Sequence, residues 1–103
     1  MRGHDRRRYL VFEVMSEIEL DKYKLLNAIW DSVHSLYGDI GTSESKLWLI
    51  KYDKNGRGVL RCTHRKVEAI RAALACIHSV NGVQIAITVI GISGTIKGAA
   101  RIA

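Results

Sequence analysis

The sequence predicts an α/β (α+β) sandwich, in which a four-stranded antiparallel sheet packs against helices. Two observations predict this class. Of the 103 residues, 48% are apolar, which is enough for one core, and period-two apolar runs alternate with runs of helical spacing. The chain also contains no proline to interrupt either kind of run. We therefore expect a single domain over residues 1–103, in which residues 1–7 form a flexible basic segment.

The first half of the chain is predicted to form a strand and a long helix. Residues 9–15 alternate, and both of their faces carry apolar side chains, which is typical of a central strand. Asp21 is a suitable N-terminal cap for a helix whose apolar residues recur at helical spacing. Gly38 is expected to end this helix, and residues 38–43 are expected to form a loop.

The second half is predicted to form a hairpin, a helix, a strand and a short last helix. Residues 46–53 and 58–63 have strand patterns, and Asn55-Gly56 between them is a strong turn signal. Apolar residues at helical spacing follow over residues 67–77, and Asn81-Gly82 is expected to end that helix before a β-branched strand at 85–92. The order βαββαβ predicts a ferredoxin-like sheet, which is also the topology of the RNA-recognition motif.

Charge is segregated along the chain, whose formal net charge is +6. Residues 1–8 and 51–71 are basic, whereas residues 9–50 are acidic. A segregated basic region is typical of a protein that binds a polyanion. We predict that five side chains of the second basic segment lie along one ridge and contact RNA phosphates; a solvated basic surface is the alternative. These five are Arg57, Arg61, Arg65, Lys66 and Arg71.

The last predicted strand runs directly into Ser93-Gly94-Thr95-Ile96-Lys97. Either Ser93 or Thr95 can cap the short final helix, because a hydroxyl oxygen accepts a hydrogen bond from an unpaired backbone N–H of the first turn. Lys97 is then placed to bind a phosphate. The alternative is that Lys97 is solvated and the segment only joins a strand to a helix.

The predicted sheet has more apolar surface than its helices can cover. Trp48, Ile50 and Tyr52 lie on one side of the second strand, opposite Leu47 and Leu49 on the other. Two helices cover only one face of a four-stranded sheet, and the short third helix covers part of the second face. We therefore predict a protein-partner interface at Trp48, Ile50 and Tyr52. Base stacking on the sheet is not expected, because residues 58–64 contain no Phe or Tyr.

No pattern indicates a metal site or independent catalysis. Cys62 and His64 share a face of a strand, but Cys76 and His78 would lie about 200° apart on a helix, so no metal is predicted. No nucleophile with a base and no close carboxylate pair stands out, so the chain is not expected to catalyse a reaction by itself. The two cysteines and the absence of any signal-like or membrane-spanning run predict a cytoplasmic protein.

An ordered set of segments across nearly the whole chain resembles the archaeal ribonuclease P proteins of the component-two class, which are related to the eukaryotic Pop family. The segments are residues 8–12 (RYLVF), 28–30 (AIW), Gly38 with Gly41, 47–53 (LWLIKYD), 58–61 (GVLR), 64–74 and 91–97 (GISGTIK). The resemblance implies a non-catalytic subunit of the ribonucleoprotein that removes the 5′ leader from precursor tRNA.

The resemblance also implies partners and a cofactor. The catalytic RNA uses Mg²⁺, and the protein itself binds no cofactor. The implied partners are the ribonuclease P RNA, precursor tRNA and a TIM-barrel-like protein called component three, with a homodimer of the small subunit inside a heterotetramer. Members of the family often continue into a longer basic helix, whereas this chain ends at Ala103, so the main RNA contact is expected over residues 57–71.

Two other classes of function remain open from the residues alone. The first is a small ligand-binding regulatory domain of ferredoxin-like fold, which would need a specific pocket and would not require the division of charge. The second is a generic RNA-binding module, which would need stacking aromatic side chains.

Overall fold

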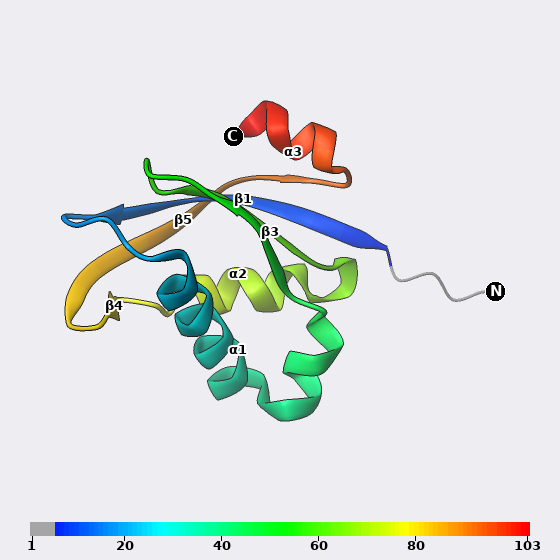
Figure 1. Cartoon of the computed structure of the whole chain (residues 1–103). Helices are drawn as coiled ribbons and strands as arrows, with labels where there is room; N and C mark the ends of the chain where they lie inside the picture. Colours follow the sequence, from blue (N-terminus) through cyan, green and yellow to red (C-terminus); the bar gives the residue numbers. More distant parts are fainter. Residues whose placement is uncertain (1–5) are drawn as a thin grey trace.

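The computed structural model describes residues 6–103, which form an antiparallel sheet with α1 and α2 on one face and α3 on the other (Figure 1). The expected mixed α/β class is confirmed. The elements are β1 (Arg7–Ser16), α1 (Lys22–Ser45), β2 (Trp48–Tyr52), β3 (Arg57–Thr63), the 3-10 turn η1 (His64–Lys66), α2 (Val67–Ala75), β4 (Ser79–Val80), β5 (Val83–Ser93) and α3 (Ile96–Ile102). None of the helices in the described residues has the length and apolar character needed to span a membrane.

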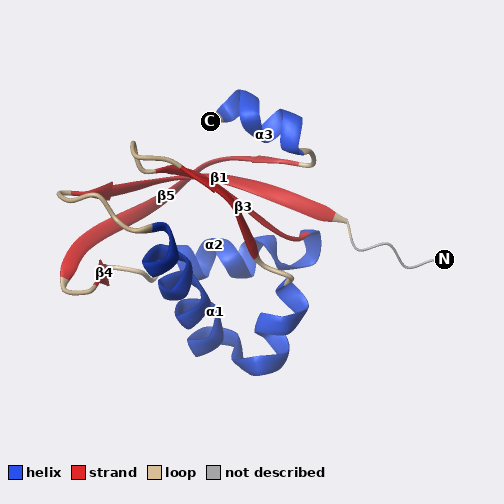
Figure 2. Ribbon diagram, in the orientation of Figure 1, coloured by secondary structure: helices blue, strands red, loops and turns tan. Residues whose placement is uncertain are grey.

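The sheet has five strands in the order β2-β3-β1-β5-β4, so the expected count of four is wrong (Figure 2). The extra strand is β4, whose two residues pair with Val83 and Gln84 at the start of β5. Asn81 and Gly82 both have positive φ, 51° and 81°, as the tight turn of a hairpin requires. They therefore close the β4–β5 hairpin, and α2 ends earlier, at Ala75.

Helix α1 begins as predicted and ends later than predicted. The Asp21 carboxylate accepts hydrogen bonds from the backbone N–H groups of Tyr23 and Lys24 at 3.1 and 3.2 Å. Gly38 has φ 71° and ψ −171°, which bends the helix without ending it. The Thr42 hydroxyl donates to the Gly38 carbonyl at 2.7 Å and holds the second, shorter segment in place. The loop predicted at residues 38–43 is therefore wrong.

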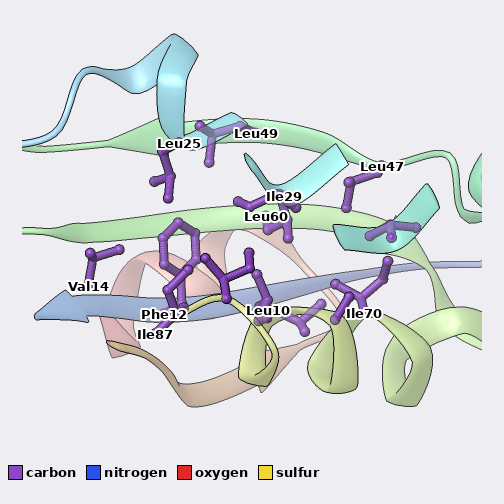
Figure 3. Close-up of a cluster of buried hydrophobic side chains, with 14 of the residues drawn as sticks. Leu10, Phe12, Val14, Leu25, Ile29, Leu47, Leu49, Leu60, Ile70 and Ile87 are labelled. Carbon is purple, nitrogen blue, oxygen red and sulfur yellow. The ribbon is translucent and has the colours of Figure 1, made fainter. Parts of the chain in front are cut away.

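The core lies between the sheet and the pair α1 and α2 (Figure 3). Leu10, Phe12 and Leu60 from the sheet are fully buried there against Leu25 and Ile29 of α1. Burial of this apolar area is the main source of stability in a domain of this size. The same cluster anchors the first half of α1 and the length of α2 to one face of the sheet.

The opposite face is covered only in part, as expected, by α3. Ala99 and Ile102 of α3 pack on Val11 of β1 and Val59 of β3. A Cβ atom on Gly91 would lie 2.7 Å from the Ile102 side chain, so the glycine lets α3 approach β5 closely. Beyond α3 this face stays open, and Trp48 on the edge strand β2 is 53% exposed.

Candidate nucleic-acid interface

One end of the sheet gathers basic residues from three separate segments of the chain. Strand β1 begins where β3 ends, because Arg7 is paired with Thr63, and the His64 N–H donates to the Arg6 carbonyl at 2.8 Å. Strand β5 also ends here, since Tyr9 is paired with Ser93. We call the group the basic end; it consists of Arg6, Arg7, Arg8, Lys46, His64, Arg65 and Lys66.

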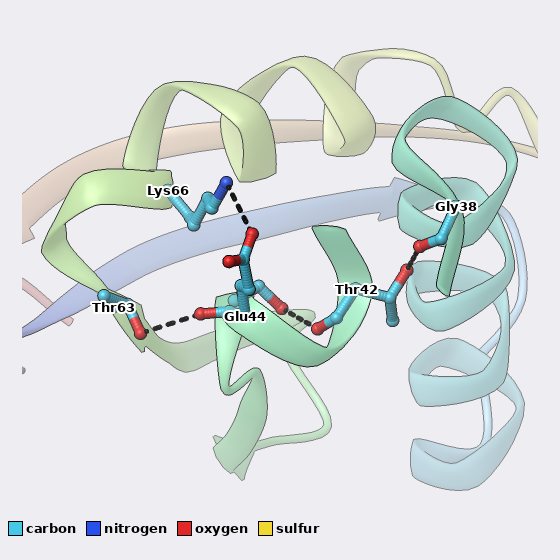
Figure 4. Close-up of polar contacts among 6 residues, drawn as sticks. Gly38, Thr42, Glu44, Thr63 and Lys66 are labelled. Atoms are coloured by element: carbon cyan, nitrogen blue, oxygen red, sulfur yellow. Dashed lines mark hydrogen bonds and ion pairs between the residues drawn. The ribbon is translucent and has the colours of Figure 1, made fainter. Parts of the chain in front are cut away.

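The last turn of α1 is fastened to the basic end by polar contacts (Figure 4). The Thr63 hydroxyl donates to the Glu44 carbonyl at 3.2 Å, and the Lys66 Nζ lies 3.5 Å from the Glu44 carboxylate. A hollow of about 330 Å³ opens here, lined by Glu44, Lys46, Thr63, Arg65 and Lys66. Its three basic side chains and one carboxylate give it net positive charge, which suits a phosphate group.

Carboxylates form ion pairs with some of the predicted phosphate-binding side chains but not with others. Arg57 lies 3.5 Å from Glu13, and Arg71 lies 3.9 Å from Glu68. These pairs are exposed to solvent, so they weaken the positive potential without abolishing it. Within residues 6–103, no carboxylate lies within ion-pair distance of Arg61, Arg65 or Lys97.

The five side chains predicted to form one ridge do not share a face. Arg57 and Arg61 alternate with buried residues of β3 and point to the α3 side of the sheet. Arg65 and Lys66 lie in η1 at the strand end, and Arg71 is on α2, on the other side. The single ridge is therefore wrong, because the chain turns from one face of the sheet to the other between β3 and α2.

The residues predicted for a protein-partner interface are also divided. Strand β2 carries an irregularity between Leu49 and Lys51, so that Trp48 opposes Arg61 while Tyr52 opposes Gly58. Ile50 packs with the cluster under α3, and Tyr52 stacks on Phe12 in the main core, with ring centroids 6.3 Å apart. The shared face predicted for the three is wrong for Tyr52, because the bulge reverses the alternation.

The turn into α3 has the hydroxyl contacts of a helix cap. The Thr95 hydroxyl accepts from the Gly98 N–H at 2.9 Å, and the Ser93 hydroxyl accepts from the Thr95 N–H at 3.2 Å. Thr95 is thus the cap, and Ser93 orders the residue before the helix. Lys97 is exposed in the first turn of α3.

Arg6, Arg7 and Arg8 were not among the predicted binding residues, although their charge is plain in the sequence. We expected residues 1–7 to be flexible, whereas Arg7 already belongs to β1 and the Arg6 carbonyl is hydrogen bonded. Residues 1–5 lie outside the described part of the chain. The signal that could have found these arginines is their position directly before a central strand whose partner strand ends in His64-Arg65-Lys66.

The two cysteines lie in different surroundings. Cys62 is fully buried in the main core, and burial raises the pKa of its thiol to about 11. Cys76 is exposed just after α2. A buried thiol of this kind stays protonated and unreactive near neutral pH.

A small α/β domain with a basic end built from several segments is typical of proteins that bind polyanions. Residues 8–103 match the family model described as the Rpp14/Pop5 family, and the chain belongs to this family.

Similar proteins include the ribonuclease P protein component 2 of Methanothermobacter thermautotrophicus, which is 40% identical over 102 residues, 92% of this chain and 82% of that protein. The proteins of the same name from Pyrococcus furiosus and Methanosarcina mazei are 37% and 36% identical, covering 90% and 91% of this chain and 78% and 80% of theirs. The resemblance noted in the sequence is thereby confirmed. A chain of the cryo-EM structure of yeast ribonuclease MRP shares the fold, with a TM-score of 0.73 and 11% identity over 92% of this chain and 79% of that one.

Proposed function

We propose that this chain is a protein subunit of ribonuclease P, which assists the catalytic RNA in removing the 5′ leader of precursor tRNA. The observation that carries the proposal is family membership over residues 8–103, together with relatives named ribonuclease P protein component 2 that cover most of the chain. The protein supplies no catalytic group in this proposal. The Mg²⁺ ions act in the RNA.

The basic end is the proposed RNA contact. Arg7 and Arg65 are exposed, and neither has a carboxylate partner among the described residues. Side chains of this kind bind phosphates without regard to base sequence, and each contact releases condensed counterions from the RNA. Neutralising phosphates lowers the repulsion within the folded RNA, so less Mg²⁺ is needed to hold it in its active form.

Reconstituted cleavage of precursor tRNA over a range of Mg²⁺ concentrations tests the proposal. The wild-type chain, added to the ribonuclease P RNA and the other protein subunits, should lower the Mg²⁺ concentration that gives half-maximal rate. The double variant Arg7→Gln, Arg65→Gln should shift that concentration upward. The matched control is Lys22→Gln, Lys24→Gln, which removes the same charge from the exposed start of α1 at the far end of the sheet. Identical Mg²⁺ profiles with and without the chain would refute the proposal.

A second protein subunit is part of the same proposal, and the TIM-barrel-like component three is the partner we expect. We assign the contact to exposed apolar side chains around the bend of α1, where Leu36, Tyr37 and Ile40 lie and Ile40 is 76% exposed. Ile40→Glu should abolish co-elution with component three in size-exclusion chromatography. Ile18→Glu is the control, because Ile18 is the same residue type and is also exposed, at 54%, but lies in the loop before α1. Co-elution of the Ile40 variant with component three would show that the interface does not lie at the bend of α1.

A further inference from the structure

Three adjacent strands carry a row of side chains on the face that α3 partly covers. Arg61 of β3 is directly opposite Trp48 of β2 on one side and Tyr9 of β1 on the other. Directly opposed residues of neighbouring antiparallel strands have Cβ atoms about 5 Å apart, close enough for their side chains to touch. We call Trp48, Arg61 and Tyr9 the aromatic row.

Arg61 stands in this row without an acidic partner. No carboxylate of residues 6–103 is within ion-pair distance, and its Nε is buried with no hydrogen-bond acceptor. Buried donors are seldom left unpaired in native proteins, so this one requires an explanation. Arg57 provides the contrast, because it lies on the same face of the same strand and is paired with Glu13 at 3.5 Å.

The two tryptophans of the chain differ in their exposure to solvent. Trp30 packs against the main core, whereas Trp48 is 53% exposed on the edge strand β2. The exposed indole ring of Trp48 and the neighbouring guanidinium of Arg61 are both groups that stack on nucleobases. Tyr9 is half-buried against the cluster under α3, which holds that side of the row in place.

We propose that the aromatic row binds an unpaired RNA nucleotide, whose base stacks on Trp48 and whose phosphate pairs with Arg61. The inference rests on the proposed RNA-binding function and adds a contact to a base. Base stacking was not expected because β3 has no aromatic residue, but the rings come from the two strands that flank it. Arg7 precedes Tyr9 by two positions and shares its face, so the row continues the positive surface of the basic end.

Charge favours RNA over a protein as the occupant of the row. Arg61 and Arg7 have no carboxylate partner among the described residues, so this part of the α3 face is positive, and an RNA strand brings both the base and the phosphate that the row lacks. A protein contact at Trp48 would leave the charge of Arg61 to be compensated by a carboxylate from that partner. The test below separates the two occupants.

Fluorescence of Trp48 provides a direct test. In the full chain carrying Trp30→Phe, Trp48 is the only tryptophan, so its emission reports on this site alone. Decauridylate should quench the emission as a base stacks on the ring. Inorganic polyphosphate, which has the charge but no bases, should bind without quenching. Trp48→Leu should weaken decauridylate binding about tenfold, whereas Trp48→Phe should retain most of the affinity.

Matched variants assign the phosphate contact. Arg61→Gln should weaken decauridylate binding more than Arg57→Gln, because only Arg57 is already paired. Unchanged Trp48 emission and unchanged affinity of the Trp48→Leu variant, in a chain that still binds RNA, would overturn the aromatic row and favour a protein contact at Trp48. A wild-type chain that binds neither decauridylate nor duplex RNA would contradict the proposed function itself, so the two failures are distinguishable.

Discussion

The two ends of the sheet differ in charge although the same strands connect them. Arginines begin β1 at the basic end, and Glu17 and Glu19 follow it at the other. Asp53 and Glu19 both act on Tyr52 there: burial and then the carboxylates of Asp53 and Glu19 raise the pKa of Tyr52. We call Glu17, Glu19, Asp21 and Asp53 the acidic end; Lys22, Lys24 and Lys54 lie beside them, so the net charge there is close to neutral. Antiparallel pairing thus converts a division of charge along the chain into a division across the length of the sheet, which leaves one end suited to RNA.

Charge reversal at the two ends should have the largest and most unequal effects. The variant Arg6→Glu, Arg7→Glu, Arg65→Glu should lower RNA affinity on the order of a thousandfold at low salt, and the dependence of affinity on salt should become flatter. The variant Glu17→Lys, Glu19→Lys, Asp53→Lys changes the same number of charges at the acidic end. It should leave affinity unchanged or slightly higher. Filter binding across a salt series checks both, and equal losses would show that the ends do not differ in RNA contact.

Substituting two glycines of positive φ compares how rigid the chain is at the acidic end and in the β4–β5 turn. Gly56 has φ +86°, and a Cβ there would lie 2.5 Å from the Val14 carbonyl oxygen, whereas Gly82 has φ +81° and open space. Gly56→Ala should cost about 3 kcal/mol, because it adds a backbone clash to the strain of the left-handed conformation. Gly82→Ala should cost about 1 kcal/mol. Urea unfolding measures both, and similar costs would mean that the hairpin at Gly56 relaxes freely.

Alkaline pH should loosen the core beneath the basic end. The pKa of Cys62, which is paired with Arg8 across the sheet, is about 11 in the folded protein against an ordinary 9.0. Between these values the unfolded chain loses the thiol proton and the folded chain keeps it, so the free energy of unfolding should fall as pH rises, by at most about 1.4 kcal/mol per pH unit. Below pH 9 this group should cause no change.

Denaturation at a series of pH values checks the effect with two matched variants. Cys62→Ala should be less stable near neutral pH, because it loses buried packing, but its alkaline slope should be shallower. Cys76→Ala should follow the wild-type curve, since Cys76 is exposed. An unchanged slope in the Cys62 variant would assign the alkaline loss to other groups.

The smallest effects are expected at the turn into α3, where stability and RNA function should separate. Thr95→Ala removes the acceptor for the Gly98 N–H and should cost about 1 kcal/mol of stability. Lys97→Ala should leave the melting temperature nearly unchanged, as exposed charges contribute little, and should slow cleavage of precursor tRNA at limiting Mg²⁺. Normal cleavage by the Lys97 variant at every Mg²⁺ concentration would leave the turn a structural role only.

The sequence patterns located most elements but not the irregular ones. Strands β1, β3 and β5, the caps at Asp21 and Thr95, and α3 lie close to their predicted places, because alternation, helical spacing and capping hydroxyls are local signals. The bend at Gly38 could not be foreseen in this way. A glycine that ends a helix and one that bends it look alike until a neighbour, here the Thr42 hydroxyl, takes up the free carbonyl.

By itself, the sequence determined the α/β class, the family and the presence of a basic region, since hydrophobic periodicity, an ordered set of motifs and charge are all properties of the linear chain. Only the tertiary structure decided which charges act together. Strand pairing brought the arginines of β1 beside η1, and the bulge in β2 separated Trp48 from Tyr52. Register and bulges depend on contacts between residues distant in sequence, and a shift of one position moves a side chain to the opposite face.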